Sequence, residues 1–161
     1  TWKQEGGEEP FYEQDQDVLF WLPTLQYFLE TAIRLREAEI VDVGGEIELD
    51  GKTHQRVYLT WQSYEPNDTV DQYLAYLDAE TGRLTRVDFT VRDVAGFLVG
   101  TAAYSDFREV GDYVLPYLIE IGDDPPGNLL HRYTIREWKP GVELTESEYA
   151  PDPKRAPGKK H

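Results

Sequence analysis

The sequence contains no cysteine among its 161 residues. Without thiols, the protein cannot form disulfides, use a thiolate nucleophile or bind zinc through sulfur. It also lacks an apolar run of about 18 residues, so we expect no membrane-spanning helix. It opens without the charged and then apolar pattern of a signal peptide, and Thr1 in place of methionine predicts a processed or trimmed chain.

Basic residues are scarce, with 16 lysines and arginines against 31 acids and a formal net charge of −15. Such a charge repels phosphate backbones, so we expect no nucleic-acid partner. Four of the bases lie in residues 151–161, which we interpret as a disordered basic tail. The polar residues 1–14 are expected to be a flexible lead-in, and residues 15–150 a single domain.

A helical pattern of apolar residues lies within residues 17–36, where the spacings are one, three and four. The residues of this stripe are Val18, Leu19, Leu22, Leu25, Leu29 and Ile33. Pro23 is expected either to kink this helix or to mark its true first turn. Trp21 and Phe28 widen the apolar surface, which predicts a helix covered on more than one side.

From Ile40 onward the period changes to two, which is typical of strands. Asp50-Gly51 between two alternating apolar runs predicts a tight hairpin. Further strands are expected over 73–78, 84–92, 99–108, 113–121 and 129–138, separated by turn-forming residues. The predicted fold is α+β and mostly β, a curved antiparallel sheet or incomplete barrel of about seven strands wrapped on one apolar helix. A seven-stranded sandwich is the alternative.

Several hairpin motifs resemble the LolA-like outer-membrane lipoprotein-carrier superfamily over roughly residues 40–153. The motifs are Tyr76 to Leu84 with its Asp78 and Thr81-Gly82, Tyr104 to Val110 followed by Val114-Leu115-Pro116, Thr134 to Arg136, Gly141 to Leu144, and Tyr149-Ala150-Pro151. The resemblance implies a half-open antiparallel barrel with a helix as lid, a location in the periplasm or cell envelope, and an apolar cavity for lipoprotein acyl chains. Members usually have several strands before the lid helix, whereas here only residues 1–16 precede it.

No motif predicts catalysis, a metal site or a cofactor. Ser105, Asp106 and His131 could lie on adjacent strands, but consecutive strand residues point to opposite faces, so we expect no triad. The acids of residues 13–17 lack the central glycine and the later glutamate of a calcium loop and are interpreted as a helix entry. We therefore expect a non-enzymatic protein.

The large apolar residues of the helix and strands could fill the core or line a ligand cavity. The candidates for a hydrophobic cavity are Trp21, Leu25, Phe28, Leu29, Val57, Leu59, Trp61, Val87 and Phe89. The first functional hypothesis is an envelope protein that binds a hydrophobic ligand such as a lipid or lipoprotein acyl chain. The alternative is an envelope protein-protein interaction or structural module without a ligand cavity, acting through its acidic exterior or a strand edge.

Overall fold

The computed structural model describes residues 16–65, 68–92, 98–123 and 128–143. The expected lead-in and basic tail lie outside these residues. The chain divides into two compact units, residues 1–29 with 141–161 and residues 30–140. The second unit contains every strand of the described residues.

The predicted helix is confirmed as α1, Gln16–Arg34, which continues into the short 3₁₀ helix η1, Leu35–Glu37. The helix extends on both sides of Pro23. In the strand-containing unit, Thr31 and Leu35 are only 1% and 5% exposed. None of the described helices has the length and hydropathy that a bilayer span requires.

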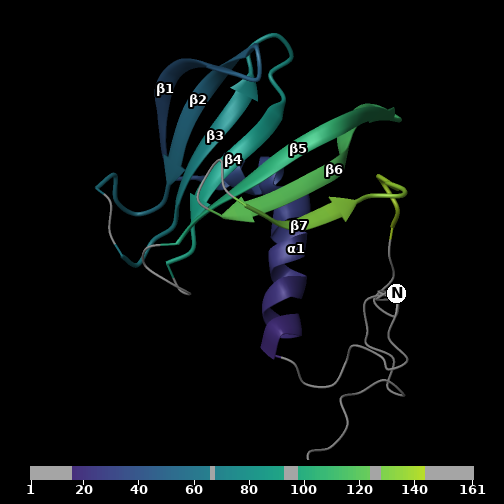
Figure 1. Ribbon diagram of the computed structural model, residues 1–161, viewed down its shortest axis with the longest axis horizontal. Helices are drawn as coiled ribbons and strands as arrows, with labels where there is room; N and C mark the ends of the chain where they lie inside the picture. The colour runs from purple at the N-terminus through teal and green to yellow at the C-terminus, as the bar shows by residue number, and fades with distance from the viewer. Residues whose placement is uncertain (1–15, 66–67, 93–97, 124–127, 144–161) are drawn as a thin grey trace, which may run out of the picture. The chain divides into compact units, whose positions relative to one another are not determined.

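Seven strands form one antiparallel sheet in the order β1 to β7, so each strand pairs with its neighbours in sequence (Figure 1). The strands are β1 Ile40–Leu49, β2 Lys52–Thr60, β3 Gln72–Asp78, β4 Leu84–Thr90, β5 Val99–Val110, β6 Tyr113–Asp123 and β7 Leu129–Thr134. The sheet is open, with β1 and β7 at its edges. The predicted mostly-β, incompletely closed sheet is confirmed, and the sandwich is not formed.

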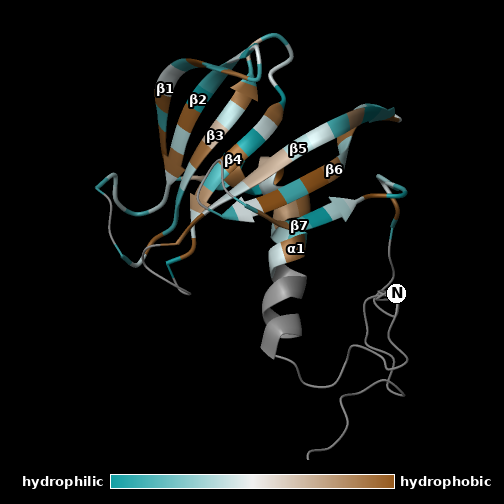
Figure 2. Ribbon diagram, viewed as in Figure 1, coloured by the Kyte–Doolittle hydropathy of each residue, from teal (hydrophilic) through white to brown (hydrophobic). Residues whose placement is uncertain are grey.

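The two faces of the sheet differ in chemistry, because side chains alternate along each strand and the register aligns them across strands. Figure 2 shows hydrophobic bands crossing β3 to β6. The apolar face carries Leu59, Tyr73, Ala75, Val87, Phe89, Ala102, Tyr104, Ile119 and Ile121, all at most 8% exposed. The opposite, polar face carries His54, Tyr76, Asp78, Arg86, Asp88, Ser105 and Glu120 among others.

The first hairpin has the predicted Asp50-Gly51 turn, in which both residues adopt positive φ, 50° and 74°. The register of β1 shifts between Val43 and Gly45, where φ is 76°. This bulge moves the odd-numbered residues of β1 from one face of the sheet to the other. Val43 therefore lies on the apolar face, whereas Leu49 lies on the polar face.

The turn between β3 and β4 explains the Asp78-x-x-Thr81-Gly82 motif. The Asp78 carboxylate accepts hydrogen bonds from the Thr81 amide at 2.8 Å, the Thr81 hydroxyl at 2.9 Å and the Glu80 amide at 3.1 Å. The bonds from Thr81 hold the pKa of Asp78 below its usual value. Gly82 adopts φ 69° and donates to the Asp78 carbonyl. The motif therefore stabilises the turn between β3 and β4.

The Tyr104-to-Arg108 motif builds a cross-strand cluster on β5 and β6. Asp106 adopts φ 51° and binds the Arg108 guanidinium at 2.5 Å, which lowers the pKa of Asp106. The same guanidinium lies over the ring of Tyr117 on β6, 4.2 Å from its centre. This motif therefore contributes to strand pairing, and no described contact links it to catalysis.

Four predicted strand ends are wrong. β5 and β6 end later than expected, at Val110 and Asp123, whereas β4 and β7 end earlier. β7 ends at Thr134 instead of Trp138, because the residue of β6 that would come opposite Arg136 is Pro116, which has no N–H to donate. Trp138 instead donates its indole N–H to the Pro116 carbonyl at 2.9 Å. β4 ends at Thr90, which accepts the Gln72 amide and donates to Asp71.

Candidate functional site

The centre of the apolar face is a line of modest-sized side chains that crosses five strands. Each member is the cross-strand partner of the next, and we call the set the central row. The central row consists of Val57, Ala75, Val87, Ala102 and Ile121. Its last four members are 0–4% exposed, and Val57 is half-buried. The row contains no polar side chain.

Aromatic rings flank the central row on both sides. On one side Tyr73 and Phe89 are stacked with ring centres 6.5 Å apart. On the other side Tyr104 pairs with Ile119, which in turn pairs with Tyr133. Small side chains between rows of rings make a surface that fits an elongated apolar group without offering a hydrogen bond.

The structure brings together the predicted sheet residues on this face. Val57 and Val87 belong to the central row. Leu59 and Phe89 lie beside it, each paired with Tyr73, and we call these three residues the flanking row. Trp61 lies one residue beyond β2, edge-on to Tyr73 with ring centres 5.7 Å apart, and donates to the Glu37 carbonyl. Sequence reasoning missed Ala75 and Ala102 because alanine is too common to signal a site.

The predicted helical residues belong to the other compact unit, and their part in the site stays a prediction. Phe28 is 4% exposed and contacts the Tyr27 ring edge-on, Leu25 is half-buried and Leu29 is 37% exposed. Trp21 lies in the first half of α1, outside the residues whose side chains are described.

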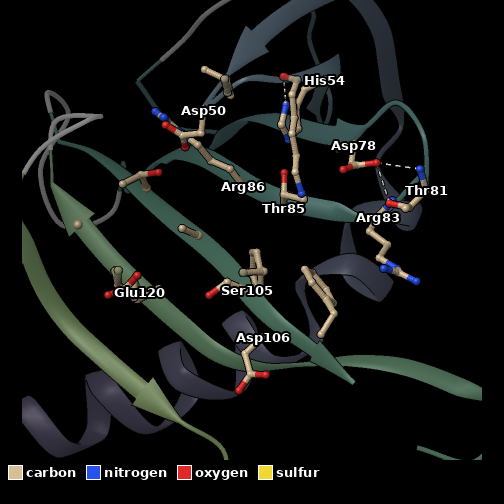
Figure 3. Close-up of a pocket in the computed structure, with 18 of the residues that line it drawn as sticks. Asp50, His54, Asp78, Thr81, Arg83, Thr85, Arg86, Ser105, Asp106 and Glu120 are labelled. Carbon is tan, nitrogen blue, oxygen red and sulfur yellow. Dashed lines mark hydrogen bonds between the residues drawn. The ribbon is translucent and has the colours of Figure 1, made fainter. Parts of the chain in front are cut away.

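A cavity of about 690 Å³ opens on the polar side of the sheet, and Figure 3 labels ten of its lining residues. Its charged lining residues are Asp50, Lys52, Asp78, Glu80, Arg83, Arg86, Asp106 and Glu120. Acids outnumber bases, so the cavity opposes anionic ligands. Several of these charges are compensated locally: Glu120 accepts from Arg132 at 2.7 Å, and Arg83 lies over the Phe107 ring.

On this face, a hydrogen-bonded cluster of Tyr76, Arg86 and Asp88 joins β3 and β4. Arg86 donates two hydrogen bonds to Asp88, at 2.7 and 3.0 Å, and stands over the Tyr76 ring. The Tyr76 hydroxyl donates to the same carboxylate at 2.8 Å. Burial, followed by the hydrogen bond to Asp88, raises the pKa of Tyr76 to about 12. The sequence does carry a signal for the Arg86–Asp88 ion pair, because side chains two residues apart in a strand lie on the same face.

The Tyr76 cluster makes stability depend on alkaline pH. The pKa of Tyr76 is raised above its unfolded value, so its contribution is complete below pH 10 and is lost as the pH rises from 10 toward 12. We expect the free energy of unfolding, measured in urea, to fall across this window. Tyr76→Phe should flatten the fall, whereas Tyr113→Phe, at a residue 57% exposed, should leave it unchanged. An equal fall in the wild type and Tyr76→Phe would contradict the assignment.

The geometry does not assemble Ser105, Asp106 and His131 into a triad. Ser105 and Asp106 both line the cavity, contrary to expectation, because the positive φ of Asp106 breaks the strand alternation. His131, however, pairs with Ile121 and lies on the apolar side. The cavity histidine, His54, donates from Nδ1 to the Lys52 carbonyl at 3.0 Å. Within the described residues, no group of three His, Asp or Glu could hold a metal.

The chain was compared with protein families, curated proteins and solved structures. No family model matches the chain, and no curated protein matches it either. Among solved structures, the chain is similar to the crystal structure of an inferred outer membrane lipoprotein-sorting protein domain from Vibrio parahaemolyticus. The identity is 16% and the TM-score 0.45, and the match covers 68% of this chain and 45% of that one. The chain thus spans less than half of that protein.

Proposed function

We propose that this protein is a non-enzymatic component of the periplasm or cell envelope that holds the acyl chain of a lipid or lipoprotein on the apolar face of its sheet. The observation that carries the proposal is the central row, a line of apolar side chains with aromatic rings on both sides. A methylene chain needs apolar contact along its length and no hydrogen bonds, which is what this row offers.

Burial sets the energetics of such a site. Each methylene removed from water contributes about 0.8 kcal/mol, which is about a fourfold gain in affinity. The row is almost fully buried in the structure, so a ligand must displace the side chains that cover it. The cost of that opening reduces the apparent affinity but leaves its dependence on chain length unchanged.

Native mass spectrometry of gently purified protein, before and after organic extraction, tests for a bound lipid. Titration with octanoate, dodecanoate and palmitate then measures the chain-length dependence. We expect the affinity to rise about fourfold per methylene until the row is filled. Ala102→Leu fills the row and should abolish binding, whereas its strand neighbour Ala103→Leu, on the polar face, should not.

A second variant keeps the test valid if Ala102→Leu does not fold. Val57 is half-buried at one end of the row, so Val57→Trp can be accommodated there while it shortens the row. The affinity should then level off at a shorter chain. The proposal is wrong if no fatty acid or lipopeptide binds the wild type, or if Ala102→Leu and Ala103→Leu reduce binding equally while both remain folded.

A further inference from the structure

The outer edge of β1 is open. β1 pairs with β2, and its other side pairs with no strand of the described chain (Figure 1). Residues 41–46 are all exposed, and the side chains of Val41 and Val43 keep 57% and 66% of their surface in contact with solvent. An open edge of this length presents N–H and C=O groups that can pair with another strand. Near the bulge two backbone groups already have side-chain partners: the Val43 amide donates to the Asp42 carboxylate, and the Gly44 carbonyl accepts from Arg56, both at 2.8 Å. A strand that uses the Val43 amide must replace the bond to Asp42.

The bulge gives this edge two chemically different halves on one face. Val41 and Val43 are the partners of Leu59 and Val57, so both lie on the apolar side. After the bulge the register shifts by one residue, and Glu46 and Glu48 occupy that same side opposite Gln55 and Thr53. Neither glutamate forms an ion pair within the described residues. On the apolar side of the sheet, the part of β1 before the bulge is therefore apolar and the part after it is acidic.

We propose that the outer edge of β1 binds an extended, basic segment of a partner protein by strand addition. Alternate apolar side chains of that segment cover Val41 and Val43, and its Lys or Arg side chains lie opposite Glu46 and Glu48. Main-chain hydrogen bonds hold the segment, and the charge order sets its direction. This inference is independent of acyl-chain binding, which uses the interior of the sheet.

Charge disfavours a second copy of the chain as the occupant. In a parallel pairing of two β1 strands, Glu46 and Glu48 would face their own copies across the interface. In an antiparallel pairing centred on the bulge, the valines would face the glutamates, so neither apolar nor charged contacts would form. Two chains of net charge −15 also repel each other, whereas a basic segment is attracted.

The test uses three blocked peptides and backbone amide chemical shifts of the full chain. The probe Lys-Thr-Lys-Thr-Val-Thr-Val runs antiparallel to β1 with its lysines at the acidic half. Its lysines and valines alternate with threonine, so all four lie on the side that carries Val41, Val43, Glu46 and Glu48. Control peptides replace lysine by glutamate or scramble the order. We expect the lysine peptide alone to shift the β1 amides and to slow their hydrogen exchange. Glu46→Lys/Glu48→Lys should weaken this binding by about tenfold or more and allow the glutamate peptide to bind.

The matched control is Glu109→Lys/Asp112→Lys, which makes the same charge change at exposed residues of the β5–β6 hairpin. It should leave lysine-peptide binding at β1 within about twofold, because the charges lie far along the sheet order. The proposal is overturned if no peptide binds, if the shifts map outside β1, if both charge variants weaken binding equally, or if sedimentation shows that β1 pairs with a second copy.

Discussion

Replacing Ile119 with alanine is expected to lower the free energy of unfolding by about 2–5 kcal/mol. Ile119 is 0% exposed and lies on β6, paired with Tyr104 on one side and Tyr133 on the other. Truncation removes apolar contacts and leaves a cavity that flanking strands cannot close without breaking their pairing. Urea unfolding followed by far-UV circular dichroism measures the loss.

Two controls separate packing from general disturbance of the sheet. Ile119→Val removes one methylene and should cost about 0.5–1.5 kcal/mol. Leu130→Ala on β7, where the side chain is 52% exposed, should change stability by about 0.5 kcal/mol or less. If Ile119→Ala proved as mild as Leu130→Ala, the apolar face would not be the packed core that the burial of Ile119 indicates.

The turns of this fold could be predicted because they are local. Asp50 and Gly51 in the first turn and Gly82 in the Thr81-Gly82 turn adopt positive φ, and each turn fixes the register of the strands beside it. The order of the sheet then follows, since consecutive strands joined by short turns pair with each other. The single helix was equally visible, because its apolar stripe has a helical period.

Features that depend on a neighbouring strand could not be predicted. In β1, alternation alone places Val43 and Leu49 on one face, but the register shift at Gly45 separates them. The early end of β7 depends on Pro116, a residue of another strand. Within single strands, the sequence shows only that two positions share a face, and the register decides what lies beside them.

The candidate site divides in the same way. Alternation correctly placed Val87 and Phe89 on one face of β4. It could not show that Ala75 and Ala102 lie on either side of Val87, because that juxtaposition comes from three strands. The cavity on the polar face was missed for the same reason, since its walls come from residues far apart in sequence.

Gly100 provides the sharpest test of the flanking row, because its missing side chain makes room for a ring. A Cβ added at Gly100 would lie 2.5 Å from Cζ and 2.7 Å from Cε2 of Phe89, its cross-strand partner. Both distances are well inside van der Waals contact, and Phe89 is only 8% exposed, so the ring cannot move aside freely. We expect Gly100→Ala to lower the free energy of unfolding by about 1–3 kcal/mol.

A double-mutant cycle distinguishes this clash from an intrinsic requirement for glycine. Phe89→Leu removes the far edge of the ring, so Gly100→Ala should cost little in that background, and the coupling energy should reach about 1 kcal/mol or more. No backbone strain competes with this explanation, since Gly100 does not belong to the positive-φ glycines. An equal cost of Gly100→Ala in the wild-type and Phe89→Leu backgrounds would mean that the ring does not rest on Gly100. The flanking row would then be more open than its burial indicates, and an acyl chain would have to be sought beside Phe89 as well as along the central row.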